Sequence, residues 1–235
     1  MSTLTTIVMP IYDDVTQLDF TGPHQFFSRM PDTQVIVASI SGKSIHASGL
    51  VFCDLADLNA IEQCDVLCVP GGYGCVAALE DDAYLSAIRR LGGSARYVTS
   101  VCTGSIILGA AGLLKGKRAA CHWSWRDLLP AFGAIPDAGR IVCDGNVITG
   151  GGVTAGIDFA LTLIAELAGD EMAQSIQLSL EYAPEPPFHA GRPDIAPPEI
   201  VEKVAARIAA LRPTARVEQA AQRLMSSVSE TAAAG

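Results

Sequence analysis

The chain has 235 residues, of which 49% are hydrophobic and 17% are charged, so it can bury one sizeable core. Its net charge of −9 and its pI near 4.8 argue against a nucleic-acid partner, because phosphate binding draws on clustered lysine and arginine. No uninterrupted apolar run approaches the roughly 20 residues that cross a bilayer, so we expect no membrane partner.

The cysteine content favours a reducing compartment. Seven cysteines are present, an odd number, and the segment from Met1 to Met9 lacks the basic region and long apolar stretch of an export signal. Both observations favour a soluble, cytoplasmic protein with reduced thiols. No Cys-x-x-Cys pair occurs, and most of the cysteines are interpreted as small hydrophobic residues. We therefore expect neither a metal site nor a cofactor.

In the first half of the chain, apolar runs predict β-strands at residues 5–12, 34–39, 64–70 and 97–101. After the first strand, a loop leads into a short helix that begins at 21–23 and carries His24 to Phe27. A minor hairpin is predicted at 44–52. A helix is predicted from Cys75 to about Arg90, with Gly92-Gly93 as its C-terminal stop.

In the second half, the patterns predict a strand at 117–121, a hairpin at 141–149, and helices at 154–167 and 170–182. Residues 183–198 are too rich in proline for a regular element, and an alanine-rich helical pattern returns at 200–228. Strands that alternate with helices indicate an α/β fold, with a mainly parallel sheet covered on both faces. We expect a flavodoxin-like three-layer sandwich in a single domain over 1–235, with a core to about 183 and a C-terminal extension over 184–235.

The segment from Tyr97 to Ser105 predicts a strand that ends at Cys102 and turns directly into a helix. Ser100 and Gly104 flank the cysteine at two positions on either side, where a nucleophile elbow needs small residues. The turn is expected to expose the sulfur at the helix N-terminus, where free N–H groups and the helix dipole favour the thiolate. Cys102 is therefore the candidate nucleophile.

Polar or glycine-rich loops follow three of the predicted elements at the carboxyl ends of strands, where ligands collect in parallel sheets. One holds Asp19, an acid between Leu18 and Phe20 in an otherwise apolar stretch. Carboxylates are seldom buried without a partner, so Asp19 is the candidate acid of a site. The alternative is an N-cap for the helix predicted to begin at 21–23.

The second loop holds Gly71-Gly72, and the third is the elbow itself. Backbone N–H groups at Gly72 and Thr103 are candidate donors for developing negative charge, as in an oxyanion site. A cysteine nucleophile usually has a histidine base, but Thr103 follows Cys102 directly. His122 could be brought close by the fold, or it could be a packed histidine at the end of a strand. The other histidines have weaker claims: His24, His46 and His189.

Taken together, these motifs resemble the PfpI / class I glutamine amidotransferase-like superfamily, and within it the isocyanide hydratases. The likeness covers residues 15–23, 69–72, 101–105, 108–114, 122–123, 150–158, 180–184 and 186–188. Protease-like members place a histidine after the cysteine, and many members carry a glutamate where this chain has Asp19. These departures disfavour peptidase or glutaminase activity. The resemblance instead implies a Cys102–Asp19 pair, with Thr103 supporting the acid.

The resemblance further implies a cysteine-dependent hydro-lyase that converts an isocyanide and water into an N-substituted formamide through a thioimidate. It implies no cofactor, a small-molecule isocyanide substrate and a homodimer. Two alternatives stay open. One is a ligand-sensing module like that of AraC-type regulators, although the roughly 50 residues after Tyr182 are short of a DNA-binding domain. The other is a glyoxalase or deglycase acting on reactive carbonyls.

Overall fold

The computed structural model describes the backbone of residues 4–233, and side chains up to Ser226. Residues 1–3, the start of the segment assessed for an export signal, lie outside this range. A seven-stranded sheet runs through the middle in the order β10-β11-β7-β6-β1-β2-β5. The strands are β1 (Thr5–Pro10), β2 (Thr33–Ser39), β5 (Ala56–Asp57), β6 (Val66–Val69), β7 (Tyr97–Val101), β10 (Ile141–Asp144) and β11 (Val147–Gly150). Neighbours pair in parallel except β10 with β11, which confirms the mainly parallel sheet.

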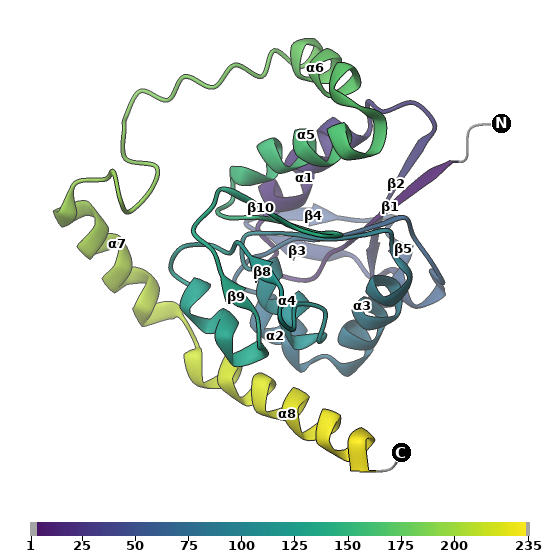
Figure 1. Cartoon of the computed structure of the whole chain (residues 1–235), viewed down its shortest axis with the longest axis vertical. Coiled ribbons are helices and arrows are strands. Elements are labelled where there is room, and N and C mark those ends of the chain that lie inside the picture. The colour runs from purple at the N-terminus through teal and green to yellow at the C-terminus, as the bar shows by residue number, and fades with distance from the viewer. Residues whose placement is uncertain (1–3, 234–235) are drawn as a thin grey trace.

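Helices cover both faces of this sheet (Figure 1). One layer holds α1 (Gln17–Phe27), α5 (Ala155–Ala168) and α6 (Asp170–Ser179), and the other holds α2 (Cys75–Glu80), α3 (Asp82–Ser94) and α4 (Gly104–Ala110). In the first layer the rings of Phe27 and Phe159 meet edge to face, with centroids 6.1 Å apart. The expected three-layer α/β sandwich is confirmed.

The helix predicted from Cys75 to Arg90 is in fact two helices. The chain breaks at Asp81, whose side chain accepts a hydrogen bond from the Tyr84 N–H at 3.0 Å and caps α3. The proposed stop at Gly92-Gly93 is also wrong, because α3 continues to Ser94. Helical periodicity continued across the break, so only the capping chemistry of Asp81 marked the boundary.

Smaller elements complete the body. The predicted hairpin at 44–52 is confirmed as β3 (Ile45–Ala47) and β4 (Leu50–Phe52). The remaining elements are a parallel pair, β8 (Arg118–Ala119) and β9 (Ile135–Pro136), and the 3₁₀ helices η1 (Ile40–Gly42), η2 (Leu58–Ala60) and η3 (Arg126–Phe132). No helix in the described part of the chain is long and apolar enough to span a membrane.

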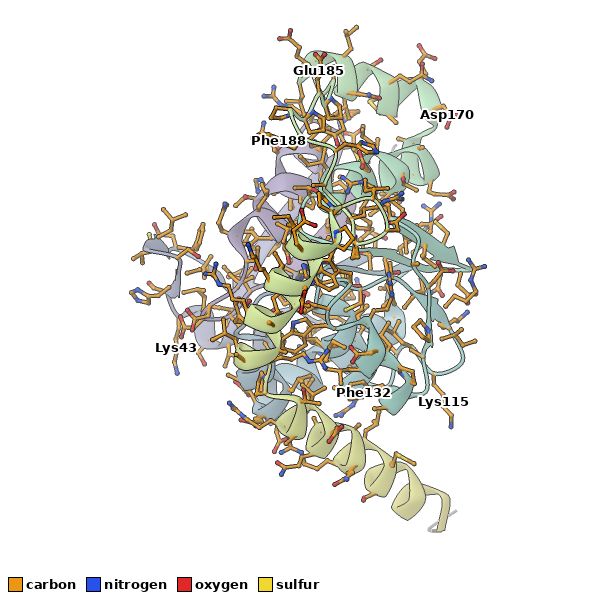
Figure 2. The ribbon with its side chains drawn as sticks, turned by 90° about the vertical axis from the view of Figure 1, so that its left-hand side faces the viewer. Lys43, Lys115, Phe132, Asp170, Glu185 and Phe188 are labelled. Carbon is orange, nitrogen blue, oxygen red and sulfur yellow. The ribbon has the colours of Figure 1, made fainter. Side chains whose placement is uncertain are left out.

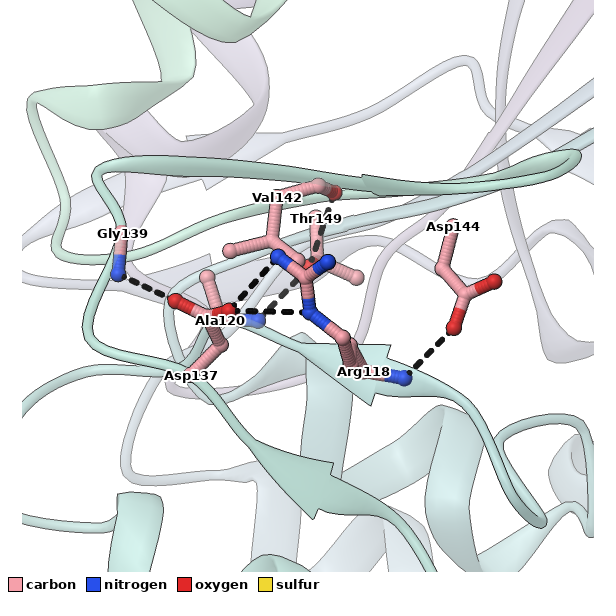
Figure 3. Close-up of polar contacts among 7 residues, drawn as sticks. All are labelled: Arg118, Ala120, Asp137, Gly139, Val142, Asp144 and Thr149. Atoms are coloured by element: carbon pink, nitrogen blue, oxygen red, sulfur yellow. Dashed lines mark hydrogen bonds and ion pairs between the residues drawn. The ribbon is translucent and has the colours of Figure 1, made fainter.

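Hydrogen bonds fasten the strand pair β8–β9 to the edge of the main sheet (Figure 3). Thr149 on β11 is fully buried, and its hydroxyl accepts from the Ala120 N–H at 2.8 Å. Arg118 donates two hydrogen bonds to Asp137, and its backbone N–H donates to Asp144 at 2.8 Å. These bonds fix the segment that leads into Cys121 and His122.

The C-terminal region leaves the sandwich. Residues 183–197 form the irregular segment expected from their prolines, and in Figure 1 they run as an arm away from the body. The helical stretch predicted at 200–228 is divided into α7 (Pro198–Leu211) and α8 (Thr214–Ala233). Pro213 explains the division, because a proline disfavours helical geometry in the residue before it. The partition into a core to about 183 and an extension over 184–235 stays a prediction.

Replacing Thr149 by valine keeps the β-branched shape and removes the hydroxyl, leaving the buried Ala120 N–H without its acceptor. We expect the free energy of unfolding to fall by about 1–3 kcal/mol, the usual cost of an unpaired buried donor. Urea denaturation measures it. Thr33→Val is the matched control, since that hydroxyl bonds only to the nearby Pro31 carbonyl, and it should change stability by less than about 0.5 kcal/mol. Equal losses in both variants would contradict the anchoring role.

Candidate active site

Cys102 lies in the tight turn between β7 and α4. Its φ is +60°, a left-handed conformation that is strained for a residue with a side chain. Gly104 allows the turn, because a Cβ there would lie 2.1 Å from the carbonyl oxygen of Val69. Ser100 is buried, and its hydroxyl lies 2.8 Å from that of Ser105. The requirement for small residues on both sides of the cysteine is thus met by the packing.

Asp19 lies in the first turn of α1 and is fully buried. Because α1 begins at Gln17 and not at 21–23, the N-cap alternative is wrong. One carboxyl oxygen, Oδ2, accepts a hydrogen bond from the Gly71 N–H at 2.9 Å. The other, Oδ1, receives no hydrogen bond of ordinary geometry from any residue that the structure describes. A buried carboxyl with a free oxygen is costly for folding, which points to a use for it.

The electrostatics of the pair differ from the expectation. Burial raises the pKa of Asp19 to about 7, against the lowering effect of the Gly71 N–H and of the Cys102 thiol. Burial and the Asp19 charge also raise the pKa of Cys102 well above its usual value, and only the Thr103 N–H opposes them appreciably. The expected exposure of the sulfur is therefore wrong, because Cys102 is only 4% exposed, and its burial beside Asp19 favours the thiol form.

The physical reason is that desolvation and a neighbouring carboxylate together outweigh the N-terminus of a short helix. Cys102 and Asp19 are close enough for each to change the pKa of the other. Such groups titrate as a coupled pair, so each apparent pKa describes the pair and not one residue. The site can therefore hold a proton at neutral pH and pass it on.

Thr103 fastens the loop that follows β6. Its hydroxyl accepts from the Gly72 N–H at 2.8 Å and lies 3.2 Å from the Gly72 carbonyl oxygen. The loop in turn presents the Gly71 N–H to Asp19, so the contact of Thr103 with the acid runs through the backbone. A Cβ at Gly71 would lie 2.6 Å from the Thr103 hydroxyl and 2.9 Å from Asp19 Oδ2, so no side chain fits there.

The arrangement limits which of the two predicted backbone donors, the N–H groups of Gly72 and Thr103, can bind the substrate. The Gly72 N–H is already bonded to Thr103, and it can reach a substrate atom only if that bond is exchanged. Its role as a donor to substrate stays a prediction. The Thr103 N–H is directed at the Cys102 sulfur and favours its charged form. The sequence had marked both glycines, but the one that holds Asp19 is Gly71.

A cavity of about 170 Å³ opens above Cys102. Its lining comes from loops on several strands and from the C-terminal extension: Thr16, Gly72, Tyr73, Cys102, Thr103, His122, Ser124, Trp125, Val153 and Ile208. Sequence reasoning named none of Thr16, Tyr73, Ser124, Trp125, Val153 and Ile208 as site residues, although Thr16 and Val153 lie in stretches that carry the family likeness. Among the described residues, no three His, Cys, Asp or Glu side chains are grouped to hold a metal ion.

His122 is the histidine that the fold brings to this cavity; His24, His46 and His189 do not line it. The His122 Nδ1 lies 2.8 Å from the Ser124 hydroxyl. Burial lowers the pKa of His122, so its ring is neutral near pH 7. Its ring is held by Ser124, and among the described residues no hydrogen bond joins it to the Cys102 sulfur, so a role in the chemistry stays a prediction.

Comparisons with known proteins agree with this geometry. The model of the DJ-1/PfpI family matches residues 5–166. An isonitrile hydratase from Pseudomonas putida is 51% identical over 203 residues, covering 85% of this chain and 88% of the relative. The crystal structure of a ThiJ/PfpI family protein from Pseudomonas syringae is 40% identical with a TM-score of 0.89, covering 94% of this chain and 91% of that one.

A more distant relative is the HTH-type transcriptional regulator CdhR from Pseudomonas aeruginosa, 30% identical over 150 residues. That match covers 62% of this chain and 41% of the regulator. The similarity to a regulator is therefore confined to a part of each protein.

The raised pKa of Asp19 predicts a pH-dependent stability. The folded chain binds this proton more tightly than the unfolded chain, whose carboxyl has a pKa near 3.8. The resulting stabilisation is fully present below about pH 4 and is lost as the pH rises through about 7. Relative to wild type, Asp19→Asn should therefore gain about 2–4 kcal/mol of unfolding free energy between roughly pH 4 and pH 8. Urea denaturation across this range measures the gain, and a pH-independent difference would contradict it.

Proposed function

The chain belongs to the DJ-1/PfpI family, and we propose that it is an isocyanide hydratase, an enzyme that adds water to an isocyanide and releases an N-substituted formamide. The observation that carries the proposal is the buried Cys102–Asp19 pair, in which Cys102 lines a small cavity and Asp19 lies buried behind that lining. The identity shared with the Pseudomonas putida isonitrile hydratase over most of both chains supports it. Such a reaction makes the enzyme a hydro-lyase.

The reaction needs a nucleophile and a group that both accepts and returns a proton. In the first step, the Cys102 sulfur forms a bond to the terminal carbon of R–N≡C, and its thiol proton passes to Asp19. Asp19 then returns that proton to the same carbon, which gives the thioimidate R–N=CH–S–Cys. A carboxyl with a pKa near 7 suits this relay, because proton transfer is most efficient when the pKa lies near the working pH.

In the second step, water adds to the thioimidate carbon. Asp19, ionised again, takes a proton from the water and passes it to the nitrogen, giving R–NH–CH(OH)–S–Cys. Collapse of this adduct breaks the carbon–sulfur bond, releases R–NH–CHO and restores the thiol with the hydroxyl proton. Atoms and charges balance over the cycle, and no cofactor is needed.

The surrounding groups have supporting roles in this scheme. Gly71 holds one carboxyl oxygen of Asp19, which leaves the other free to exchange a proton with sulfur, carbon or water. The Thr103 N–H stabilises negative charge on the Cys102 sulfur when it attacks and when it leaves. Thr103 is proposed as a catalytic residue, and its hydroxyl maintains the shape of the loop. Gly72 is proposed as a donor to the substrate.

We further propose a homodimer located in the cytoplasm. Large apolar side chains stand exposed outside the pocket, among them Leu178 and Phe188 at 82% and 80%. Surfaces of this kind favour contact with another protein surface. Sedimentation velocity of the purified chain tests this, and a monomer at micromolar concentration would refute the dimer.

Incubation with an alkyl isocyanide tests the function. The wild-type protein should form the formamide, and Cys102→Ala should lose more than about 10³-fold in kcat because the covalent route is gone. Cys53→Ala, at an exposed cysteine, is the matched control and should keep its activity. Undiminished turnover by Cys102→Ala would remove the thioimidate mechanism. Lactate-type products from a dicarbonyl would favour the deglycase alternative, and tight ligand binding without turnover would favour the sensing module.

Asp19→Asn tests the proton relay. Asparagine can still accept the Gly71 hydrogen bond but cannot carry the proton, so we expect kcat to fall by about 10²–10⁴-fold. In the wild type, kcat/KM should rise with pH up to about 7. Over this range the doubly protonated pair loses the proton of Asp19, which gives the carboxylate that accepts the thiol proton. A wild-type rate in the asparagine variant would reduce Asp19 to a structural residue.

A further inference from the structure

Helix α7 contributes a side chain, Ile208, to the lining of the pocket that contains Cys102. Figure 2 shows the helix crossing the front of the body between the arm above and α8 below. Its partly buried positions recur every three or four residues, which defines one inward face: Val201, Ala205, Ile208 and, just past the end, Arg212. Ile208 lines the same cavity as Cys102, and it is the lining residue that comes from the C-terminal extension.

The helix is held mainly at its two ends. None of the residues of α7 is fully buried. Near its start, Ile200 and Val204 share a cavity of about 80 Å³ with Trp123 and with Pro193 of the arm. Beyond its end, Arg212 fastens it to the body.

Arg212 makes that attachment through its guanidinium group. It donates to the Ser124 carbonyl at 2.5 Å and to the Asp127 carboxylate at 2.7 Å, and its side chain is only 19% exposed. Ser124 also bonds to His122 and lines the pocket. The attachment therefore joins the end of α7 directly to another residue of the pocket lining. Farther on, the fully buried Val217 anchors α8 and keeps α7 from drifting along the body.

The lining of the cavity is mixed in character. It includes the polar residues Thr16, Thr103, His122 and Ser124, whereas Trp125, Val153 and Ile208 give it apolar walls. Apolar walls favour a hydrocarbon group, because its transfer from water is favourable. A cavity of about 150 Å³ accommodates benzene, so the volume of about 170 Å³ suits a substituent about as large as a six-membered ring.

We propose that α7 is a wall of the substrate pocket, and that Ile208 limits the size of the hydrocarbon substituent on the isocyanide. Arg212 is a positioning residue, which holds the helix at the distance from Trp125 that sets this limit. The identity of the substrate in this inference rests on the proposed hydratase function. The assignment of α7 as a wall of the pocket does not depend on that function.

Size-graded substrates test the role of Ile208. The ratio of kcat/KM for 1-adamantyl isocyanide to that for methyl isocyanide should rise by about tenfold or more in Ile208→Ala, because shortening a side chain that lines the pocket opens room for the larger group. Ile208→Trp should lower the ratio for cyclohexyl over methyl isocyanide by a similar factor. Leu211→Ala, on the same helix but 56% exposed, is the matched control and should leave both ratios unchanged. Ratios that do not respond to Ile208, or that respond equally to Leu211, would overturn the proposal.

Alkylation of Cys102 tests the wall without any assumption about the reaction. Methyl and cyclohexyl maleimides are compared by peptide mapping, which separates Cys102 from the exposed Cys53 and Cys143. Ile208→Ala should raise the cyclohexyl-to-methyl rate ratio at Cys102 about tenfold, and Ile208→Trp should lower it. If the protein turns over no isocyanide but these ratios shift, the proposed function fails and the wall stands. If formamide forms and neither set of ratios shifts, the wall fails and the function stands.

Variants of Arg212 test the attachment. Arg212→Met removes both hydrogen bonds, so the cyclohexyl maleimide should reach Cys102 several-fold faster, and the adamantyl substrate should gain in kcat/KM. Arg212→Lys keeps a cation beside Asp127 and should restore most of the wild-type size ratio. A methionine variant that loses activity on all substrates equally, with an unchanged size ratio, would show that Arg212 has only a structural role.

Discussion

The structure depends on one constraint, the burial of the Asp19 carboxyl beside the Cys102 thiol. Both groups are buried, so the pKa of each rises, and this favours a proton in the pair near neutral pH. Among the described residues, the Gly71 N–H gives the carboxyl its hydrogen bond of ordinary geometry, which fixes its position without neutralising it. Burial of a carboxyl destabilises the fold, and strongly shifted pKa values of this kind are typical of sites that transfer protons.

Backbone packing around this pair leaves almost no freedom. A Cβ at Gly71 would meet Thr103 and Asp19, and a Cβ at Gly104 would meet the Val69 carbonyl. The ends of β6 and β7 and the start of α1 are thereby brought together as closely as backbones allow. Above them, the pocket is completed by segments far apart in the chain, including Trp125 and Ile208.

Much of this could be predicted from the chain alone. The strands were predictable because buried parallel strands are continuous apolar runs, and the elbow because small residues flank Cys102. Asp19 stood out as an acid among apolar neighbours. The break at Asp81 was not predicted, since a capping aspartate inside a helical period gives a weak local signal. The exposure of Cys102 was predicted wrongly, because burial is a property of the fold and not of the motif.

The sequence by itself determined the α/β architecture, the elbow at Cys102 and the candidate acid Asp19, because each follows from local pattern and spacing. Tertiary structure alone decided which groups meet: that Gly71 holds the acid, that the Gly72 N–H is taken by Thr103, and that Ile208 of the C-terminal extension lines the pocket. It also decided the proton state of the pair. Desolvation depends on everything packed around a group, and no segment of the chain carries that information by itself.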